Sequence, residues 1–163
     1  MYKRQTQPGQ SLESWVEGWF KLQAYSLILL RNEGTPVVFW GDLYGTEKTE
    51  AVGNGLNRLI KLRDIANFGN QADYFDDSNV IGWTLTGAFD DEDSGAAVIM
   101  TNATGGEKEM TISAIHEGKT FVDLLGNNDA RVTLDENGQG VFPVNDGQVS
   151  VYINENLAKK LQD

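Results

Sequence analysis

One apolar run near the start of the chain, GTPVVFWGD at residues 34–42, most limits the folds open to this sequence. Pro36 suits the first position of a strand, because proline lacks the N–H that a strand ladder needs. Residues 37–40 then run apolar without alternation, which predicts a strand over residues 35–40 that is buried on both faces. Such a strand belongs in a parallel sheet flanked by helices, so the run predicts neighbouring strands on both of its edges.

Helical patterns lie on both sides of this run. Apolar residues recur at helical spacing over residues 12–31, and a second such pattern covers residues 56–66. No other run like residues 35–40 precedes it, and a lone strand cannot pair its own backbone groups. Either something else supplies the partner strands or the chain is cut from a larger α/β domain, and the second alternative is the one we favour.

The sequence after about residue 72 predicts a different kind of structure. Short alternating runs are separated by turn clusters such as NATGGE and DENG, and residues 67–71 have the composition of a linker. Seven short strands at this spacing predict an antiparallel sandwich with Greek-key connections. The predicted strands are residues 80–86, 96–101, 109–115, 120–125, 131–134, 140–144 and 148–153. An α/β remnant followed by a β-sandwich is what remains when a (β/α)8 barrel enzyme is cut near its last repeat.

The charge and the composition of the chain limit the classes of molecule that it could bind. The net charge is −11, and it is uneven: residues 1–71 carry 8 Lys/Arg and 7 Asp/Glu, whereas residues 72–163 carry 5 and 17. So acidic a surface argues against nucleic-acid and membrane-surface partners. There are no cysteines, which excludes disulfides and thiolate metal sites but leaves the redox compartment open. The apolar run at residues 22–30 is too short to span a bilayer.

Four segments in the same order resemble the C-terminal third of bacterial liquefying-type α-amylases, in glycoside hydrolase family 13. They are TQPGQSLES, WFKLQAYSLILLRNEGTPVVFWGDLYG, YFDDSNVIGW and LDENGQGVFPVNDGQVSVYI. The resemblance covers residues 6 to about 153. It implies that residues 12–31 are the seventh barrel helix, residues 35–40 the eighth barrel strand, residues 56–66 the eighth helix and residues 72–153 the β-sandwich called domain C.

The expected organisation follows from this resemblance. Residues 6–71 are a remnant of the catalytic barrel, residues 72–155 the C-terminal β-sandwich and residues 156–163 a tail. The opening MYKRQ breaks from the family pattern abruptly, so residues 1–5 are interpreted as a non-native leader.

The resemblance also implies an activity for the parent enzyme. The family hydrolyses internal α-1,4 bonds of starch or glycogen with retention, which needs two carboxyl groups about 5 Å apart. The family carries these groups on the fourth and fifth barrel strands, and a third essential Asp in an Asn-His-Asp-Thr-Gln motif. This chain has only the Thr6-Gln7 end of that motif, with Arg4 and Gln5 where His and Asp would stand. The chain is therefore expected to have no catalytic residue and to be inactive alone.

Two other functions remain as alternatives. The chain could be a stand-alone, non-catalytic glucan-binding β-sandwich, or a structural fragment that self-associates through its exposed barrel remnant. The parent's partners would be starch, glycogen or maltooligosaccharides. The ending of the chain and its MTN segment resemble cytoplasmic members of the family, so a cytoplasmic location is expected, with secretion as the alternative.

Site residues come from the resemblance alone. Some members bind calcium between the barrel and domain C, and Ser78, Asn79 and Asn102 occupy the matching positions. Amides replace both Asp ligands, and calcium affinity falls as ligand charge is lost. Calcium is thus expected in the full-length parent at most, and no cofactor in this chain. Gln7 would lie near the sugar-binding cleft, and Asp42 is interpreted as architectural.

The remaining polar and aromatic candidates have less specific interpretations. The acidic run at residues 90–93 lacks the spacing of an EF-hand loop, so a solvated hairpin loop is predicted. His116, the only histidine, is expected in an exposed turn. Four aromatic residues could either stack on sugar rings or fill the core: Trp40, Trp83, Phe89 and Tyr152.

Overall fold

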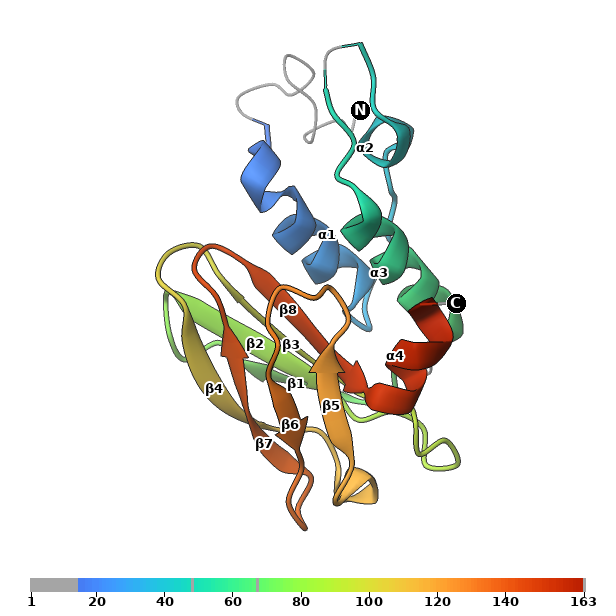
Figure 1. Cartoon of the computed structure of the whole chain (residues 1–163), viewed down its shortest axis with the longest axis vertical. Coiled ribbons are helices and arrows are strands. Elements are labelled where there is room, and N and C mark those ends of the chain that lie inside the picture. The colour runs from blue at the N-terminus through green and yellow to red at the C-terminus, as the bar shows by residue number, and fades with distance from the viewer. Residues whose placement is uncertain (1–14, 48, 67, 163) are drawn as a thin grey trace.

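The computed structural model describes residues 15–47, 49–66 and 68–162, and it shows a layer of helices lying on one face of a β-sandwich (Figure 1). The helical elements are η1 (Gly18–Phe20), α1 (Lys21–Leu29), α2 (Trp40–Tyr44), α3 (Asn54–Ile65), η2 (Ala114–His116) and α4 (Glu155–Gln162). The strands are β1 (Gln71–Tyr74), β2 (Val80–Leu85), β3 (Ala96–Thr101), β4 (Gly106–Thr111), β5 (Thr120–Asp123), β6 (Arg131–Thr133), β7 (Gln139–Val144) and β8 (Val149–Asn154).

The strands form two sheets in which all pairs are antiparallel. Six strands follow the order β1-β2-β3-β8-β5-β6, and β4 pairs with β7. The predicted antiparallel sandwich is thus confirmed, and the predicted strand at residues 96–101 coincides with β3. The prediction at residues 109–115 ran too far, because β4 ends at Thr111 and η2 begins at Ala114. Neither β1 nor α4 was predicted from the sequence, and α4 occupies most of the segment that was expected to be a tail.

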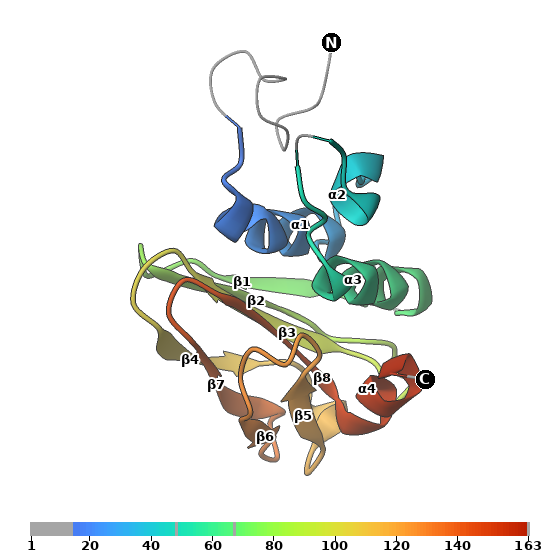
Figure 2. The same cartoon turned by 45° about the horizontal axis from the view of Figure 1, so that its top comes forward.

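The six-stranded sheet is covered on both faces, and successive side chains therefore point into two separate cores. Trp83 and Val151 belong to the cluster shared with the helices, and Ile99 and Tyr152 belong to the cluster shared with β4 and β7. In Figure 2, α1 and α3 lie on one side of this sheet and β4 and β7 on the other. This double coverage explains why β3 and β8 are buried along their whole length.

An apolar stripe attaches the helices to the sheet. Leu56, Leu59 and Leu62 recur every three residues on α3, and all three are fully buried in the same cluster as Trp83. The indole N–H of Trp83 also donates to the carbonyl oxygen of Leu30 at 2.9 Å. A buried tryptophan needs such a partner, and here it joins the end of α1 to the middle of the sheet.

The predicted strand over residues 35–40 is not formed. Residues 35–39 have no regular secondary structure, α2 begins at Trp40, and Val37 is 74% exposed. The prediction of a strand buried on both faces is therefore wrong for this structure. The physical reason is that no other strand of the described residues lies beside this segment, so the backbone groups of its residues have no ladder to join.

Candidate functional site

A buried cluster of charged and hydrogen-bonding side chains lies between α1 and α2, and we take it as the candidate site. Lys21 donates from Nζ to Oδ1 of Asp42 at 2.7 Å, and the hydroxyl of Tyr25 donates to Oδ2 of Asp42 at 2.6 Å. Lys21 and Tyr25 are one helical turn apart on α1, which places both on the face turned toward α2. Asp42 is completely buried and Lys21 is 6% exposed. The architectural interpretation of Asp42 agrees with this placement.

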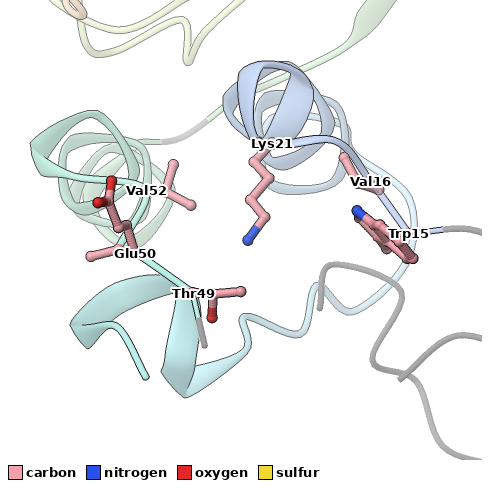
Figure 3. Close-up of a pocket in the computed structure, with 8 residues that line it drawn as sticks. Trp15, Val16, Lys21, Thr49, Glu50 and Val52 are labelled. Carbon is pink, nitrogen blue, oxygen red and sulfur yellow. The ribbon is translucent and has the colours of Figure 1, made fainter. Parts of the chain in front are cut away.

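A pocket opens beside this cluster. Its volume is about 370 Å³, and Trp15, Lys21, Thr49, Glu50 and Val52 are among the residues that line it. Figure 3 shows Nζ of Lys21 pointing into the space between Trp15 on one side and Thr49 and Val52 on the other. The pocket therefore combines a buried ammonium group with an aromatic ring and apolar walls.

The residues named for calcium lie together at one end of β2 and β3. Val80 pairs with Thr101, so Asn79 and Asn102 are neighbours just beyond the last paired residues. Ser78, Asn79 and Asn102 are exposed. Among the residues that the structure describes, no group of three His, Cys, Asp or Glu side chains could hold a metal ion. The calcium ligands remain a prediction, and Gln7 lies outside the described residues.

Asp77, next to these residues, organises the turn. Its Oδ1 accepts the backbone N–H groups of Asn79 at 2.6 Å and Val80 at 3.0 Å. These backbone hydrogen bonds hold the pKa of the Asp77 carboxyl below its usual value. The carboxylate is thus engaged in an Asx-type turn.

The acidic run at residues 90–93 is a loop whose charges are partly paired. Glu92 bonds Lys119 at 2.8 Å, and Asp93 bonds Lys160 at 3.0 Å. The hydrogen bond from Lys160 is the main cause that lowers the pKa of Asp93. These pairs hold the loop against the β5 and α4 region. The segment connects the antiparallel strands β2 and β3, as the prediction of a hairpin loop requires.

The burial of His116 differs from the prediction made from the sequence. The sequence predicts an exposed turn residue, but the side chain is completely buried in η2. Its Nε2 lies 2.9 Å from the carbonyl oxygen of Thr86, and its Nδ1 lies 3.3 Å from that of Glu92. The ring also packs edge-on against Phe121 at 5.7 Å between centroids. The prediction was wrong because the HEGK turn folds back under the 87–95 loop, a contact between distant segments.

The four aromatic candidates divide into two groups. Trp83 and Tyr152 are completely buried, and the Tyr152 hydroxyl donates to the carbonyl oxygen of Pro143 at 2.8 Å. Both therefore fill the core. Phe89 is 89% exposed and Trp40 is 65% exposed, so only these two of the four could meet a ligand from solution.

Sequence reasoning missed Asp123, which ends β5. Its carboxylate is nine-tenths buried and accepts four backbone N–H groups, from Leu125, Asn127, Asn128 and Val151, at 2.8–3.1 Å. Burial raises the pKa of Asp123, and these hydrogen bonds oppose the rise. The residue ties the loop after β5 to β8. The only signal in the sequence is an Asp followed by the turn residues GNND.

Comparison with known proteins agrees with this fold. Residues 97–153 match the family model described as alpha-amylase C-terminal. The chain is 43% identical over 150 residues to an alpha-amylase of Geobacillus stearothermophilus, covering 91% of this chain and 27% of that protein. It is 41% identical to an alpha-amylase of Bacillus licheniformis, of which it covers 30%, and 41% identical to the cytoplasmic alpha-amylase of Escherichia coli, of which it covers 33%. The chain thus spans about a third of the length of these relatives.

Solved structures show the same architecture. An Anoxybacillus alpha-amylase superposes with a TM-score of 0.60 at 13% identity, covering 83% of this chain and 32% of that one. A Geobacillus thermoleovorans alpha-amylase complexed with acarbose gives 0.58, covering 85% and 34%. These structures therefore show that the chain has the fold of the corresponding part of α-amylases. The chain as a whole is homologous to the C-terminal region of bacterial α-amylases, which confirms the family that the sequence resembles.

Proposed function

We propose that this chain supplies the C-terminal part of an α-amylase that hydrolyses internal α-1,4 bonds of starch or glycogen with retention. The observation that carries the proposal is the alignment of 91% of this chain with about a third of bacterial α-amylases. In this proposal residues 6–71 complete the catalytic barrel, and the sandwich covers the end of the barrel. The chain alone is inactive, because none of its residues matches the family's three catalytic carboxylates.

The surface of the helical layer supports this role. Four large apolar side chains, those of Trp19, Val37, Trp40 and Tyr44, are between 58% and 74% exposed. In Figure 2, α2 lies on the side of the helices away from the sheet. Exposed apolar side chains, such as the neighbouring rings of Trp40 and Tyr44 on α2, are typical of a surface that another part of a protein covers. We propose that barrel strands and helices cover it, and that residues 35–40 then pair as the eighth barrel strand.

The proposal includes a location and a metal. The relative from Escherichia coli, at 41% identity, is a cytoplasmic alpha-amylase, and a cytoplasmic location is the one proposed, with secretion as the alternative. No helix in the described residues is long and apolar enough to cross a membrane. Calcium, if the parent binds it, would use Ser78, Asn79 and Asn102 with further ligands from the barrel.

A chimera tests the proposed function. Residues 6–163 of this chain replace the corresponding part of the Bacillus licheniformis alpha-amylase, and release of reducing sugar from soluble starch is measured. We expect the chimera to hydrolyse starch, while the 163-residue chain alone releases no more sugar than a buffer blank. The catalytic portion without any C-terminal part is the matched control. Turnover by the chain alone, or a folded chimera no more active than that control, would refute the proposal.

A stand-alone glucan-binding module is the second candidate, and the exposed rings of Phe89 and Trp40 are the observation in its favour. Trp83 cannot report on such binding, because it is completely buried and its replacement would disturb the core.

A further inference from the structure

One protonation state of His116 fits its surroundings better than the other. The side chain is completely buried, and each ring nitrogen lies near a backbone carbonyl oxygen. The distance from Nε2 to the oxygen of Thr86 is 2.9 Å, and the distance from Nδ1 to the oxygen of Glu92 is 3.3 Å. A neutral imidazole has one N–H group and donates to only one of these oxygens, whereas an imidazolium ion donates to both. Protonation of the ring therefore adds one hydrogen bond.

Both carbonyl groups belong to the loop that connects β2 to β3, at residues 86–95. This loop lies close against the ring, since a Cβ atom added at Gly95 would be 2.8 Å from Nε2. The shorter distance at Nε2 favours a neutral ring that keeps its proton there and donates to Thr86. Nδ1 is then the nitrogen that loses its proton, and the contact with Glu92 is the one that is lost.

The same loop holds the C-terminal helix α4. Asp93 accepts hydrogen bonds from Nζ of Lys160 and from Nδ2 of Asn156, each at 3.0 Å. The carbonyl oxygen of Glu92 also lies 3.4 Å from Nδ2 of Asn154, at the end of β8. His116 and α4 therefore contact the loop at adjacent residues. A weaker hold on Glu92 is passed directly to Asp93 and its partners on α4.

The charged groups on these elements are mainly acidic. The loop carries four carboxylates, at residues 90–93, and Lys119 and Lys160 pair with two of them. Glu117 follows the ring in the sequence, and Phe121 of β5, which packs on the ring, has no charge. The hydrogen bond from Lys119 is the main cause that lowers the pKa of Glu92, and the charge of His116 adds to it. Excess negative charge around a buried ring favours its positive form and opposes the cost of its burial.

We propose that His116 is a pH-sensitive switch that controls how firmly the loop at residues 86–95 is held. With both nitrogens protonated, the ring donates to Thr86 and Glu92, and the loop holds α4 through Asp93. When Nδ1 loses its proton, the contact with Glu92 is lost and the loop is held less firmly. Histidine is the side chain that changes charge between about pH 5 and about pH 8, so the loop is held more firmly at the acid end of this range.

NMR of the 163-residue chain tests the switch directly, because His116 is the only histidine and gives a single set of ring signals. The chemical shifts of the two ring nitrogens are followed from about pH 5 to about pH 9, a range that brackets the ordinary histidine titration. We expect both nitrogens to carry protons at the acid end, and Nδ1 to lose its proton as the pH rises. This titration needs no substitution.

Hydrogen exchange of loop amides measures how firmly the loop is held. The backbone N–H groups of Asp91 and Ser94 form hydrogen bonds within the loop, and that of Gly147 donates to Ala103 near the other end of β3. Gly147 is the internal reference, because a ratio of protection factors cancels the ordinary effect of pH on exchange. The protection of Asp91 and Ser94 relative to Gly147 should fall by about tenfold or more as Nδ1 loses its proton, since a hydrogen bond from a charged group is lost.

His116→Phe is the matched variant. It keeps an aromatic ring against Phe121 but has no N–H donor, so its relative protection should be low at every pH. A ring that keeps one protonation state over the whole range, proton loss without a change in relative protection, or the same pH dependence in the variant would overturn the inference. None of these results bears on the chimera assay, which measures starch hydrolysis, so the proposed function would still stand.

Discussion

Among the described residues, Lys21 and Asp42 form the ion pair with the least solvent exposure. A buried pair gains little over an apolar pair of the same shape, but removal of one partner leaves an uncompensated charge. Tyr25 also donates to Asp42, so the carboxylate depends on both groups of α1. This cluster therefore holds α2 against α1, and it shapes the pocket beside Trp15.

Replacement of Lys21 tests this role at the residue scale. Lys21→Met should lower the free energy of unfolding by about 3–5 kcal/mol, because the charge of Asp42 is then buried without its ammonium partner. Lys61→Met is the control, since Lys61 is an exposed lysine on α3, and its effect should stay within about 0.5 kcal/mol. Urea denaturation measures both changes. Equal effects of the two substitutions would show that the buried pair adds nothing.

At the scale of elements, the end of α1 is joined to β1 by a compact set of contacts. Arg31 makes two parallel hydrogen bonds to Asp73, at 3.1 and 3.0 Å, and its guanidinium group lies 5.4 Å from the ring centre of Phe75. Asn32 donates from its side chain to the carbonyl oxygen of Gly69 at 2.6 Å. These bonds, together with Trp83, connect the helical layer to the edge of the sheet.

The Arg31–Asp73 pair makes this junction sensitive to acid. Its hydrogen bonds lower the pKa of Asp73 from the ordinary value of 3.8. A lowered folded-state pKa means that the stabilisation is present above pH 3.8 and is lost as the pH falls through the lower folded pKa. Because both groups are partly exposed, the pair should contribute about 0–1 kcal/mol.

A double-mutant cycle checks this pH dependence. Unfolding free energies of the parent chain, Arg31→Met, Asp73→Asn and the double variant are measured by urea denaturation from about pH 6 to about pH 2. We expect a coupling energy near neutral pH that disappears at the acid end. A coupling that persists when Asp73 is protonated would show that packing of Arg31 on Phe75, and not the ion pair, joins the elements.

At the scale of the whole molecule, the helices and the sandwich share one core. Leu59 of α3, Trp83 of β2 and Leu161 of α4 belong to a single buried cluster, so within the described part of the chain these helices cover that face of the sheet. We therefore expect both layers to unfold in one transition. The acidic charge of residues 72–163 adds solubility, but it does not replace this cover.

Deletion of residues 1–68 tests the shared core. The remaining chain should expose Trp83 and its neighbours, bind more of the dye ANS than the whole chain does, and scatter more light as concentration rises. The sequence alone suggests the opposite, since self-association through the barrel remnant would vanish on the same deletion. Loss of scattering in the truncated chain would therefore locate the association in the helical layer.

Local patterns in the sequence were sufficient to predict the β-sandwich and helix α3. Alternation and turn residues predicted β3 to the residue, because side-chain period and turn chemistry depend on near neighbours. The ordered motifs predicted the α-amylase family. The apolar run at residues 35–40 was recognised as a segment that needs partner strands, but its own conformation depends on whether those partners are present.

Only the tertiary structure decided the features that join distant segments. His116 is buried because residues 86–95 fold over it, and the Asp123 carboxylate is held by four N–H groups from β8 and the turn after β5. The pocket beside Lys21 exists because residues 15–21 and 49–52 meet across the helical layer. Burial and hydrogen-bond partners of this kind are set by contacts between residues far apart in the chain. A local sequence pattern therefore does not predict them.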